Sequence, residues 1–516
     1  MTGVNICFIS KEMPPFYYGG IGVQFQVLMR FLRDLGHTIH FVTRQPDALP
    51  DGWQKEHYYG ISVHFATDTQ TPPNGHRALD YARVVASAVH RLTQTAPIEL
   101  IIAAEFGAES FGLLTHPPHN NAGKEIPVIV TLNGPSPEIL HSNGRTPTAY
   151  DRVVCAMEDA VILQARMLIS PSRRLWSELT ARLQLKQAHR ISPNFCDLSV
   201  FKPTHQSETG PRKRIVYVGR LQRVKGVDLL IEAFTRIATE MPDCELVMIG
   251  RDLEWPEYQT TFAAYWSARL PTALLDRIQF LGPLPPADVA KELGRAWIAV
   301  FPSRWEAFGI AALESLSMGV PVIVSEGTGL AEVVGKGYPL TVAAPERVES
   351  LSEQIAKVLR DAELRDRLAN QALARAEDLQ RDATEQWRLA ISEIDSVQNV
   401  QTSPAAAAFE PVFAALNDYI AERDRLASMR LDESKERDDR IRLLEFELIS
   451  RDQLIAERDK QIARSDDTIL AKDELLDLRW SELQHLTAEV HLRDELIEAK
   501  DKWIEHMTRE VEAKRD

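Results

Sequence analysis

Residues 298–325 read IAVFPSRWEAFGIAALESLSMGVPVIVS. The segment begins and ends with short apolar runs that are typical of buried parallel strands, and the residues between them pass from a loop into an amphipathic helix. Glu306 lies in the loop, and Glu314 lies about two turns into the helix. A strand, a helix and a second strand in this order predict a parallel sheet covered by helices.

Short apolar runs alternate with helix-length amphipathic segments from residue 4 to about residue 400, in two blocks. We therefore predict an α/β fold class with two Rossmann-like domains facing a cleft, followed by a long α-helical coiled coil. The predicted boundaries are 1–195 and 196–375 for the two domains, 376–403 for a closing helix and linker, and 404–516 for the coil. The expected strands are 4–9, 39–42, 99–103, 128–132 and 167–170 in the first block, and 214–219, 246–249, 278–281, 298–302 and 320–325 in the second.

The composition excludes several classes of protein. The chain has 516 residues, of which 44% are hydrophobic and 26% are charged, as expected of a folded globular protein. Its net charge of -15 offers no basic field for nucleic acid. The four cysteines show no C-x-x-C spacing, so the sequence suggests neither a disulfide framework nor a zinc site. Without a signal sequence or a long uncharged stretch, we expect a cytoplasmic protein.

The two glutamates suit a nucleotide-sugar in chemical terms. Carboxylates at positions 306 and 314 can accept hydrogen bonds from the hydroxyls of a sugar and a ribose. A loop that enters a helix also offers free backbone N–H groups to a diphosphate, here those of Phe308, Gly309 and Ile310. Glutamates at this spacing are common on surface helices, so the surrounding residues must decide the interpretation.

Those surroundings closely resemble the E-x7-E motif of the family 4 glycosyltransferases. The matching residues are Pro302-Ser303-x-Trp305-Glu306-x-Phe308-Gly309 through Glu314. Four further segments match the family in the same order along the chain: Gly19-Gly20-Ile21-Gly22, Pro193-Asn194-x-x-Asp197-x-x-x-Phe201-x-Pro203, Gly219-Arg220-Leu221-x-x-x-Lys225-Gly226 and Phe280-Leu281-Gly282. The resemblance covers residues 4 to 400. It implies a GT-B fold, an acceptor-side first domain, a nucleotide-sugar second domain, transfer with retention of configuration, and no metal or other cofactor.

The resemblance also implies roles for four side chains. Arg220 and Lys225 would pair with the donor diphosphate and stabilise the charge that builds on the leaving nucleotide. Glu306 would face the transferred sugar, and Glu314 would accept hydrogen bonds from the ribose hydroxyls. On this interpretation Glu306, Arg220 and Lys225 are catalytic, and Asn133 is predicted to belong to the same catalytic set.

Glycines complete the expected donor site. The backbone amides of Gly19, Gly20 and Gly22 would approach the donor phosphates or the acceptor, where a side chain would collide. Gly282 belongs to a turn that would line the nucleotide.

The acceptor side departs from the family pattern. The family often has His-Gly after the strand that precedes the acceptor region, whereas this chain has Asn133-Gly134. Asn133 cannot act as a general base at neutral pH, but it can hydrogen-bond a sugar, and a plain turn-forming role is the alternative. Glu105 follows the preceding expected strand and is a candidate for the acceptor site.

The tail has a different pattern. Apolar residues recur every seven positions from Ile441 to Val511, and the same phase includes Phe413 and Ile420, which predicts a coiled coil. A helix of roughly 90 residues would be about 135 Å long. The second seam position is often basic, so the number of strands stays open. We predict homo-oligomerisation or docking to a partner protein through this coil, with a solvated single helix as the alternative.

The predicted function is transfer of a hexose from a GDP- or UDP-linked donor to a glycan or lipid-linked acceptor, in bacterial surface polysaccharide or lipopolysaccharide synthesis. Alternatives are a catalytically weak, transferase-like scaffold and another GT-B enzyme, such as a soluble disaccharide synthase or a nucleotide-sugar epimerase. A basic series in the first domain raises the further possibility of contact with the inner face of the membrane, against the alternative of a solvated surface. It comprises Arg166, Arg173, Arg174, Arg182, Lys186 and Arg190.

Overall fold

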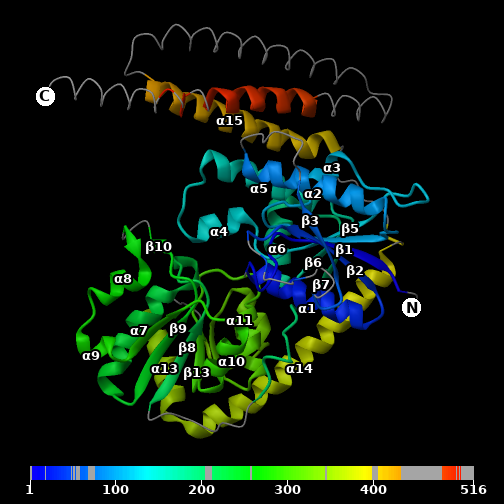
Figure 1. Cartoon of the computed structure of the whole chain (residues 1–516). Coiled ribbons are helices and arrows are strands. Elements are labelled where there is room, and N and C mark those ends of the chain that lie inside the picture. Colours follow the sequence, from blue (N-terminus) through cyan, green and yellow to red (C-terminus); the bar gives the residue numbers. More distant parts are fainter. Residues whose placement is uncertain are drawn as a thin grey trace, which may run out of the picture.

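The computed structural model describes residues 3–494 together with 497, 498 and 500. Within that range it leaves out residues 18, 48, 50–52, 54–57, 68–75, 204–211, 256–258, 343–345, 395, 398–404 and 432–478. Two α/β domains lie one above the other, and helix α15 lies on the face of the first domain that is remote from the second (Figure 1).

The first domain contains a parallel sheet of seven strands in the order β3-β2-β1-β4-β5-β6-β7. The central strands are apolar on both faces because helices cover both sides of the sheet, as in other doubly wound folds. The strands are β1 (Asn5–Ile9), β2 (Thr38–Arg44), β3 (Ser62–Ala66), β4 (Leu100–Ala104), β5 (Val128–Thr131), β6 (Met167–Ser170) and β7 (Ala188–Ile191). The helices are α1 (Gly20–Asp34), α2 (Arg77–Thr93), α3 (Gly112–Thr115), α4 (Ser136–Ser142), α5 (Ala149–Gln164) and α6 (Arg173–Leu183).

The second domain contains a parallel sheet of six strands in the order β12-β9-β8-β13-β14-β15. Its strands are β8 (Lys213–Val218), β9 (Cys244–Ile249), β12 (Ile278–Gly282), β13 (Ile298–Phe301), β14 (Val322–Ser325) and β15 (Thr341–Val342), and β10 (Glu254–Trp255) pairs with β11 (Thr260–Thr261) beside it. The helices are α7 (Val227–Glu240), α8 (Phe262–Ser267), α9 (Thr272–Leu275), α10 (Pro286–Gly294), α11 (Ile310–Ser317), α12 (Gly329–Val334) and α13 (Val348–Arg360). The segment quoted first forms β13, α11 and β14, as its pattern predicts.

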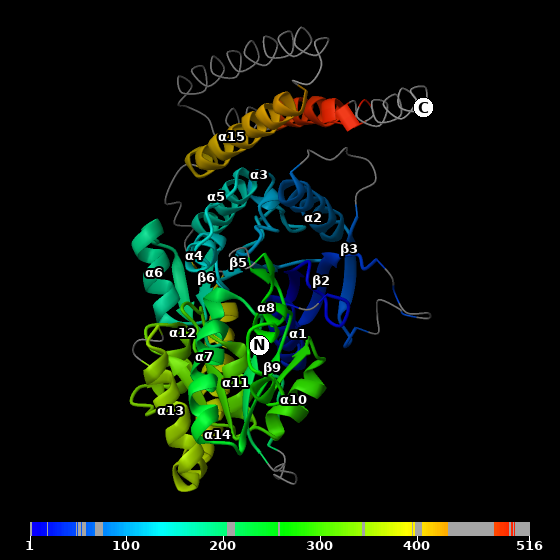
Figure 2. The ribbon, with the colours of Figure 1, turned by 90° about the vertical axis from the view of Figure 1, so that its left-hand side faces the viewer.

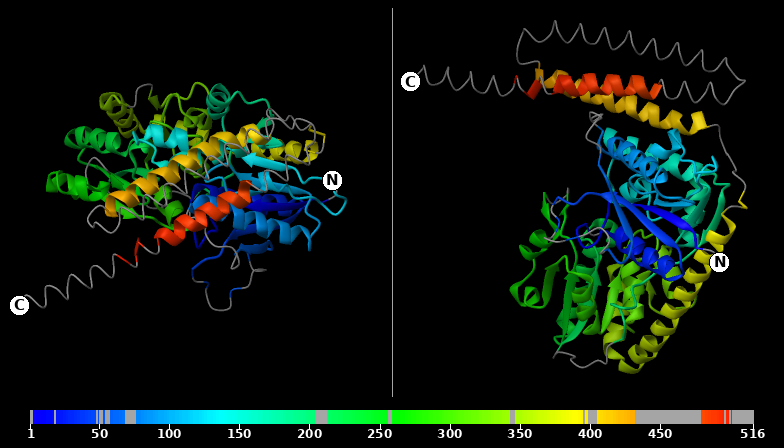
Figure 3. Two further views of the ribbon diagram at one scale, coloured as in Figure 1. Left: turned by 90° about the horizontal axis from the view of Figure 1, so that it is seen from above. Right: turned by 45° about the vertical axis from the view of Figure 1, so that its right-hand side comes forward.

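One long helix joins the two domains. Helix α14 (Ala362–Glu393) begins on the second domain, where Leu368 and Leu379 are buried in its core. Its later part crosses to the first domain, where Trp387 is buried in the same core cluster as Phe25. Figure 3 shows α14 running along the side of both domains. The expected boundary at residue 375 therefore lies inside this helix.

The C-terminal region forms helices that pack on the first domain. Helix α15 (Ala405–Leu431) buries Phe409, Val412 and Leu416 in a cluster with residues of α5. A further helix at residues 479–494 lies alongside α15 (Figures 2 and 3). The two run in the same direction, because the Arg479 guanidinium lies over the ring of Phe413 and, further along, Arg423 pairs with Asp494.

These contacts bear on the expected coil. Phe413, Ile420, Leu483 and Val490 share the predicted heptad phase, and the structure places them within one chain on a helical layer that covers the first domain. The coiled coil itself stays a prediction, because most of its expected seam lies outside the described residues: Ile441, Leu448, Ile455, Ile462, Ile469, Leu476, Ile504 and Val511. Among the described residues, no helix is long and apolar enough to cross a membrane.

Candidate active site

A cleft of 670 Å³ lies between the two domains. Its walls come from residues that follow strands of both sheets, including Glu12 after β1, Arg251 after β9 and Pro283 after β12. The carboxyl ends of the parallel strands therefore face the cleft from both sides, which is where open α/β sheets bind their ligands. Glu314 of α11 also lines this cleft.

Two of the predicted catalytic residues meet directly. The ammonium Nζ of Lys225 lies 2.6 Å from the Glu306 Oε2, and both side chains are largely buried, with 19% and 18% of their surface exposed. Lys225 ends a short 3-10 turn (Arg223–Lys225), and Glu306 lies in the loop between β13 and α11. A partly buried pair of this kind holds both groups in place more firmly than a surface pair would.

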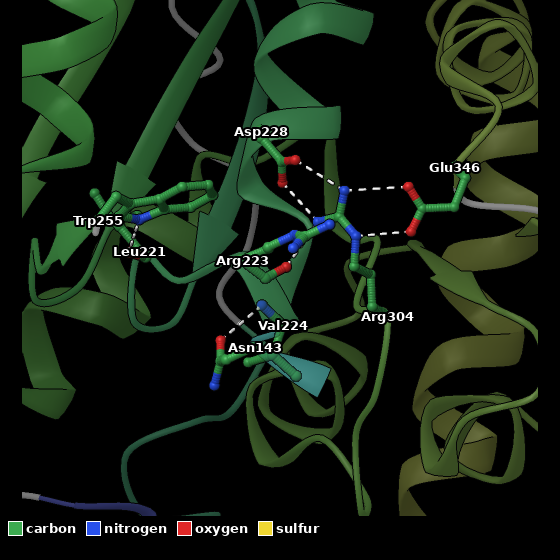
Figure 4. A network of polar contacts seen from close by, with 8 residues as sticks. All are labelled: Asn143, Leu221, Arg223, Val224, Asp228, Trp255, Arg304 and Glu346. Atoms are coloured by element: carbon green, nitrogen blue, oxygen red, sulfur yellow. Dashed lines mark hydrogen bonds and ion pairs between the residues drawn. The ribbon is translucent and has the colours of Figure 1, made fainter. Parts of the chain in front are cut away.

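Arg304 fastens these two loops together (Figure 4). Its guanidinium donates to both carboxylate oxygens of Asp228 at 2.8 Å, to Glu346 at 2.7 and 3.2 Å, and to the Arg223 carbonyl oxygen at 2.7 Å. The Arg304 amide also donates to the Val224 carbonyl oxygen at 2.8 Å. Arg304, a largely buried arginine with a bidentate partner, thus sets the position of Lys225. The sequence motif treats position 304 as variable and gave no sign of this role.

Glycine at position 226 is required by close packing. Gly226 adopts a left-handed conformation with φ of 65°, and a Cβ there would lie 1.9 Å from the Pro302 carbonyl oxygen. The two loops approach so closely that no other residue fits without moving one of them. This close packing explains why glycine follows Lys225 in the motif.

Arg220 is placed differently from Lys225. Its side chain is exposed and makes no hydrogen bond or ion pair with any residue that the structure describes. Its backbone is fixed, since its carbonyl oxygen accepts a hydrogen bond from the Tyr217 hydroxyl at 2.9 Å. The guanidinium is therefore free to pair with an anionic ligand, as the sequence predicts.

The beginning of α11 offers the expected amides. Helix α11 begins at Ile310, with Gly309 as its N-cap in a left-handed conformation and no side chain capping it. Within the described ranges, the backbone N–H groups of Phe308, Gly309 and Ile310 donate to no acceptor. They remain available for a diphosphate.

Glu314 is half-buried on the same helix and lines the cleft. Burial raises the pKa of its carboxyl to about 8. Among the residues the structure describes, it has no hydrogen-bond or ion-pair partner. An unpartnered carboxylate in a cleft is suited to accept hydrogen bonds from ligand hydroxyls, although the desolvated group must first lose its proton.

The glycine loop brings in a residue that the sequence interpretation missed. A Cβ at Gly19 would lie 2.0 Å from the Glu12 Oε1, and one at Gly22 would lie 2.7 Å from the Glu12 Cβ. The Gly22 amide donates to the Glu12 Oε2 at 2.7 Å. The residue packed against both glycines is Glu12, which caps α1 in place of the absent N-cap side chain. The approach of these glycine amides to a donor or acceptor stays a prediction.

Gly20 lies at the boundary between the domains, and Gly282 leads into the wall of the cleft. A Cβ at Gly20 would lie 4.0 Å from the Ile310 Cδ1, so the beginnings of α1 and α11 approach each other across the two domains. Gly282 ends β12 with φ of 68° and turns the chain toward Pro283 and Leu284, which line the cleft.

On the acceptor side, the structure changes the expected role of Glu105. Its side chain is fully buried, so it does not face an acceptor. It accepts hydrogen bonds from the Asn133 amide at 2.6 Å, the Gly134 amide at 2.7 Å and the Asn133 Nδ2 at 3.1 Å. Burial raises the pKa of the Glu105 carboxyl, and these hydrogen bonds act in the opposite direction. Glu105 is thus a support beneath the Asn133 turn.

No group of three or more histidine, cysteine, aspartate or glutamate side chains that could hold a metal is found in the part of the chain that the structure describes. Arg220 and Lys225 are the cations that the motif predicts at the diphosphate, and Lys11, Arg44 and Arg251 line the cleft. Metal independence stays a prediction, which transfer assays in the presence of a chelator can test.

Two family models match the chain in succession. "Glycosyltransferase Family 4" matches residues 18–200, and "Glycosyl transferases group 1" matches residues 202–375. Glycogen synthase from Mycobacterium tuberculosis is 26% identical over 422 residues, which cover 74% of this chain and 93% of that protein. Together with the fold and the motif geometry, these matches identify the class: the chain belongs to the family 4 glycosyltransferases and is an enzyme of the GT-B type.

Two solved structures share the fold. Sucrose-phosphate synthase from Thermosynechococcus elongatus superposes with a TM-score of 0.62 at 20% identity, covering 77% of this chain and all (100%) of that one. Anabaena HepE in complex with UDP and glucose superposes with a TM-score of 0.56 at 19% identity, with the same coverage of 77% and 100%.

Proposed function

We propose that the cleft binds a UDP- or GDP-linked hexose and that the enzyme transfers this hexose with retention of configuration. The Lys225–Glu306 contact at 2.6 Å supports the proposal most directly, because it places a cation beside a carboxylate at the expected junction of diphosphate and sugar. When the donor binds, Lys225 exchanges the Glu306 carboxylate for the diphosphate. Glu306 is then released to accept hydrogen bonds from the sugar hydroxyls.

Arg220 and the amides at the beginning of α11 would share the rest of the diphosphate charge. The amides are fixed by the backbone before the reaction, so their share of the stabilisation requires little reorganisation, whereas the exposed Arg220 guanidinium would have to be ordered by the ligand. Glu314 would bind the ribose hydroxyls further along α11. The presence of UDP in the HepE complex supports a nucleoside-diphosphate sugar as the class of donor.

For the acceptor, we propose a glycan or a lipid-linked sugar of the kind used in bacterial surface polysaccharide or lipopolysaccharide synthesis. Glycogen synthase, among the relatives, is named for a polymeric product. Sucrose-phosphate synthase, among the structural neighbours, is named for a small one. A soluble disaccharide synthase is therefore the alternative, and the size of the labelled product distinguishes the two.

The scaffold alternative requires a weakened donor site. Glu306, Glu314, Arg220 and Lys225 are all present, and the loops that hold them are packed and hydrogen-bonded, which favours an active enzyme. We also propose that the C-terminal helices mediate oligomerisation or partner docking. Contact with a membrane has less support, because Arg182 pairs with Glu138 and Asp159, and Arg190 pairs with Glu393.

The test is a screen of nucleotide-sugars by thermal shift, followed by an assay of donor hydrolysis and of transfer to candidate acceptors. A bound donor should raise the Tm by mass action. We expect one nucleotide-hexose to stabilise the full chain and to be hydrolysed slowly without an acceptor. Stabilisation by no nucleotide-sugar, and hydrolysis of none, would reject the proposal. Product size and product anomeric configuration would then decide between the acceptor classes.

A further inference from the structure

The turn after β5 holds the Asn133 side-chain amide in one orientation. The Asn133 Nδ2 donates to the Glu105 Oε2 at 3.1 Å, to the Thr131 carbonyl oxygen at 2.9 Å and to the Thr131 Oγ1 at 3.0 Å. A carboxylate and a backbone carbonyl can only accept hydrogen bonds. The NH₂ group must therefore face them, and the opposite orientation would set the amide oxygen against two other oxygens.

This arrangement leaves the other end of the amide available. Within the described residues, the Asn133 Oδ1 accepts no hydrogen bond, and the residue is half-buried rather than enclosed. The Oδ1 points away from the Nδ2, and thus away from the buried Glu105. Asn133 follows β5 at the carboxyl end of the sheet, the end that faces the cleft.

The same turn touches the donor-side loop of the second domain. A Cβ at Gly134 would lie 3.4 Å from the Trp305 ring, and Trp305 precedes Glu306. The Trp305 Nε1 donates to Glu178 of the first domain at 3.2 Å, so this contact joins the two domains. Asn133 therefore directly precedes the glycine that meets Trp305, and Trp305 directly precedes Glu306, the residue expected to face the transferred sugar.

We infer that Glu105 is a positioning residue for substrate specificity: it fixes the Asn133 amide so that the site offers a lone oxygen, and only a hydroxyl that donates a hydrogen bond is accepted there. The inference rests on the proposed function, since it concerns a hydroxyl of the sugar that this function transfers. It goes beyond that function because it assigns the recognising atom and the buried residue that orients it. An imidazole at position 133 could accept or donate, whereas this oxygen can only accept.

The neighbouring Glu158 offers a matched control. It is also fully buried, and it accepts hydrogen bonds from the Gly107 amide at 2.7 Å, the Ser136 amide at 2.6 Å and the Ser136 hydroxyl at 2.7 Å. It supports the same pair of loops without touching Asn133. Glu158→Gln and Glu105→Gln therefore make the same carboxyl-to-amide change at similar burial, but only the second sets an NH₂ group against the Asn133 Nδ2.

The experiment measures donor hydrolysis by the full chain with the nucleotide-hexose found in the screen and with its monodeoxy and deoxyfluoro analogues. Fluorine takes the place of a hydroxyl but cannot donate a hydrogen bond. We expect wild-type kcat/KM to fall about tenfold for both analogues at one ring position, the loss of one well-placed hydrogen bond. Glu105→Gln and Asn133→Ala should reduce this discrimination to less than about threefold, and Glu158→Gln should keep it.

The ratio between two donors does not depend on the fraction of folded enzyme, so a destabilised variant still gives an answer. Unchanged discrimination in Glu105→Gln would overturn the inference, as would equal loss in Glu158→Gln. If Glu105→Gln does not fold, Asn133→Ala decides in the same way. A wild-type enzyme that hydrolyses the donor but discriminates at no hydroxyl rejects this inference alone, whereas one that uses no nucleotide-sugar rejects the proposed function.

Discussion

The Nζ of Lys225 lies 2.6 Å from the Oε2 of Glu306, and the loops that carry the two residues are joined through Arg304. The pair has less than a fifth of each side chain exposed, so neither group is free to move far without the other. A donor diphosphate is the natural competitor of Glu306 for Lys225. The ion pair therefore holds the Lys225 and Glu306 side chains in position before the donor binds.

Glu306→Gln should retain the fold and lose most of its sugar transfer. The amide keeps the shape of the side chain but is a weaker acceptor for sugar hydroxyls and cannot stabilise positive charge on the sugar. We expect kcat to fall by about 10²–10³-fold, as for loss of one preorganised polar group. Lys291→Ala, which removes an exposed lysine paired with Asp288, serves as the control and should keep full activity. A Glu306→Gln enzyme with wild-type turnover would remove Glu306 from the mechanism.

Donor affinity should rise with pH up to about 8. Burial raises the pKa of Glu314 to about 8, so below that pH the free enzyme holds a neutral carboxyl that must lose its proton to accept fully from the ribose. The KM for the donor should fall as pH rises toward about 8 and then level off, by at most about tenfold per pH unit. Glu314→Gln should bind less tightly at pH 8 and show a flatter profile. An equally steep profile in that variant would assign the dependence to another group.

Gly19→Ala should destabilise the protein more in the wild-type background than in a Glu12→Ala background. The added methyl would lie 2.0 Å from the Glu12 Oε1, and that conflict disappears when Glu12 is truncated. Glu12→Ala alone loses the cap on the Gly22 amide, at a cost of about 1 kcal/mol. Urea unfolding of the two single variants and the double variant measures the coupling. Additive free energies would show that Glu12 does not explain the glycine.

Arg304→Ala should lower stability and also raise the donor KM. Arg304 is only 14% exposed and satisfies Asp228 as a bidentate partner, so truncation leaves a partly buried carboxylate without its main partner. We expect a loss of about 3 kcal/mol in the free energy of unfolding, measured with urea. Arg381→Ala, at an exposed position on α14, is the control and should change stability by less than about 0.5 kcal/mol. Equal stability in the two variants would contradict the network's role.

Removing residues 432–516 tests the role of the C-terminal helices while keeping α15 on the first domain. The truncation avoids exposing Phe409, Val412 and Leu416, which are buried against α5. We expect light scattering to show fewer subunits per particle for the truncated chain than for the full protein. Donor hydrolysis should continue in the truncated chain. The same number of subunits in both forms would show that these residues do not drive assembly.

The fold class, the order of the domains and most strands could be predicted from the sequence, because buried parallel strands such as Met167–Ser170 are short apolar runs with clear flanks. The two edge strands of the first sheet, β3 and β7, were missed because their residues do not form such a run. Ser62–Ala66 contains His64, which lies 3.1 Å from His40, and Ala188–Ile191 contains His189 and Arg190, so neither is a continuous apolar run.

The candidate site was predictable where its residues share a short motif and not where the fold brings distant residues together. Lys225 and Glu306 were each proposed from local spacing, but their direct contact joins positions 81 residues apart. Glu12 was missed because a carboxylate ahead of a glycine loop has no spacing rule. Glu105 was predicted as an acceptor-site residue. Its burial beneath Asn133 follows from the pairing of β4 with β5, which the sequence alone does not specify.

Calorimetry of nucleoside diphosphate binding is the most direct test of the Lys225–Glu306 exchange, with the diphosphate identified in the donor screen. Lys225→Ala should weaken binding at least about tenfold, since a charge-assisted contact is lost. Glu306→Gln should bind as tightly as wild type or more tightly, because Lys225 no longer has to leave a carboxylate. Wild-type affinity in Lys225→Ala, or equal weakening in both variants, would contradict the exchange.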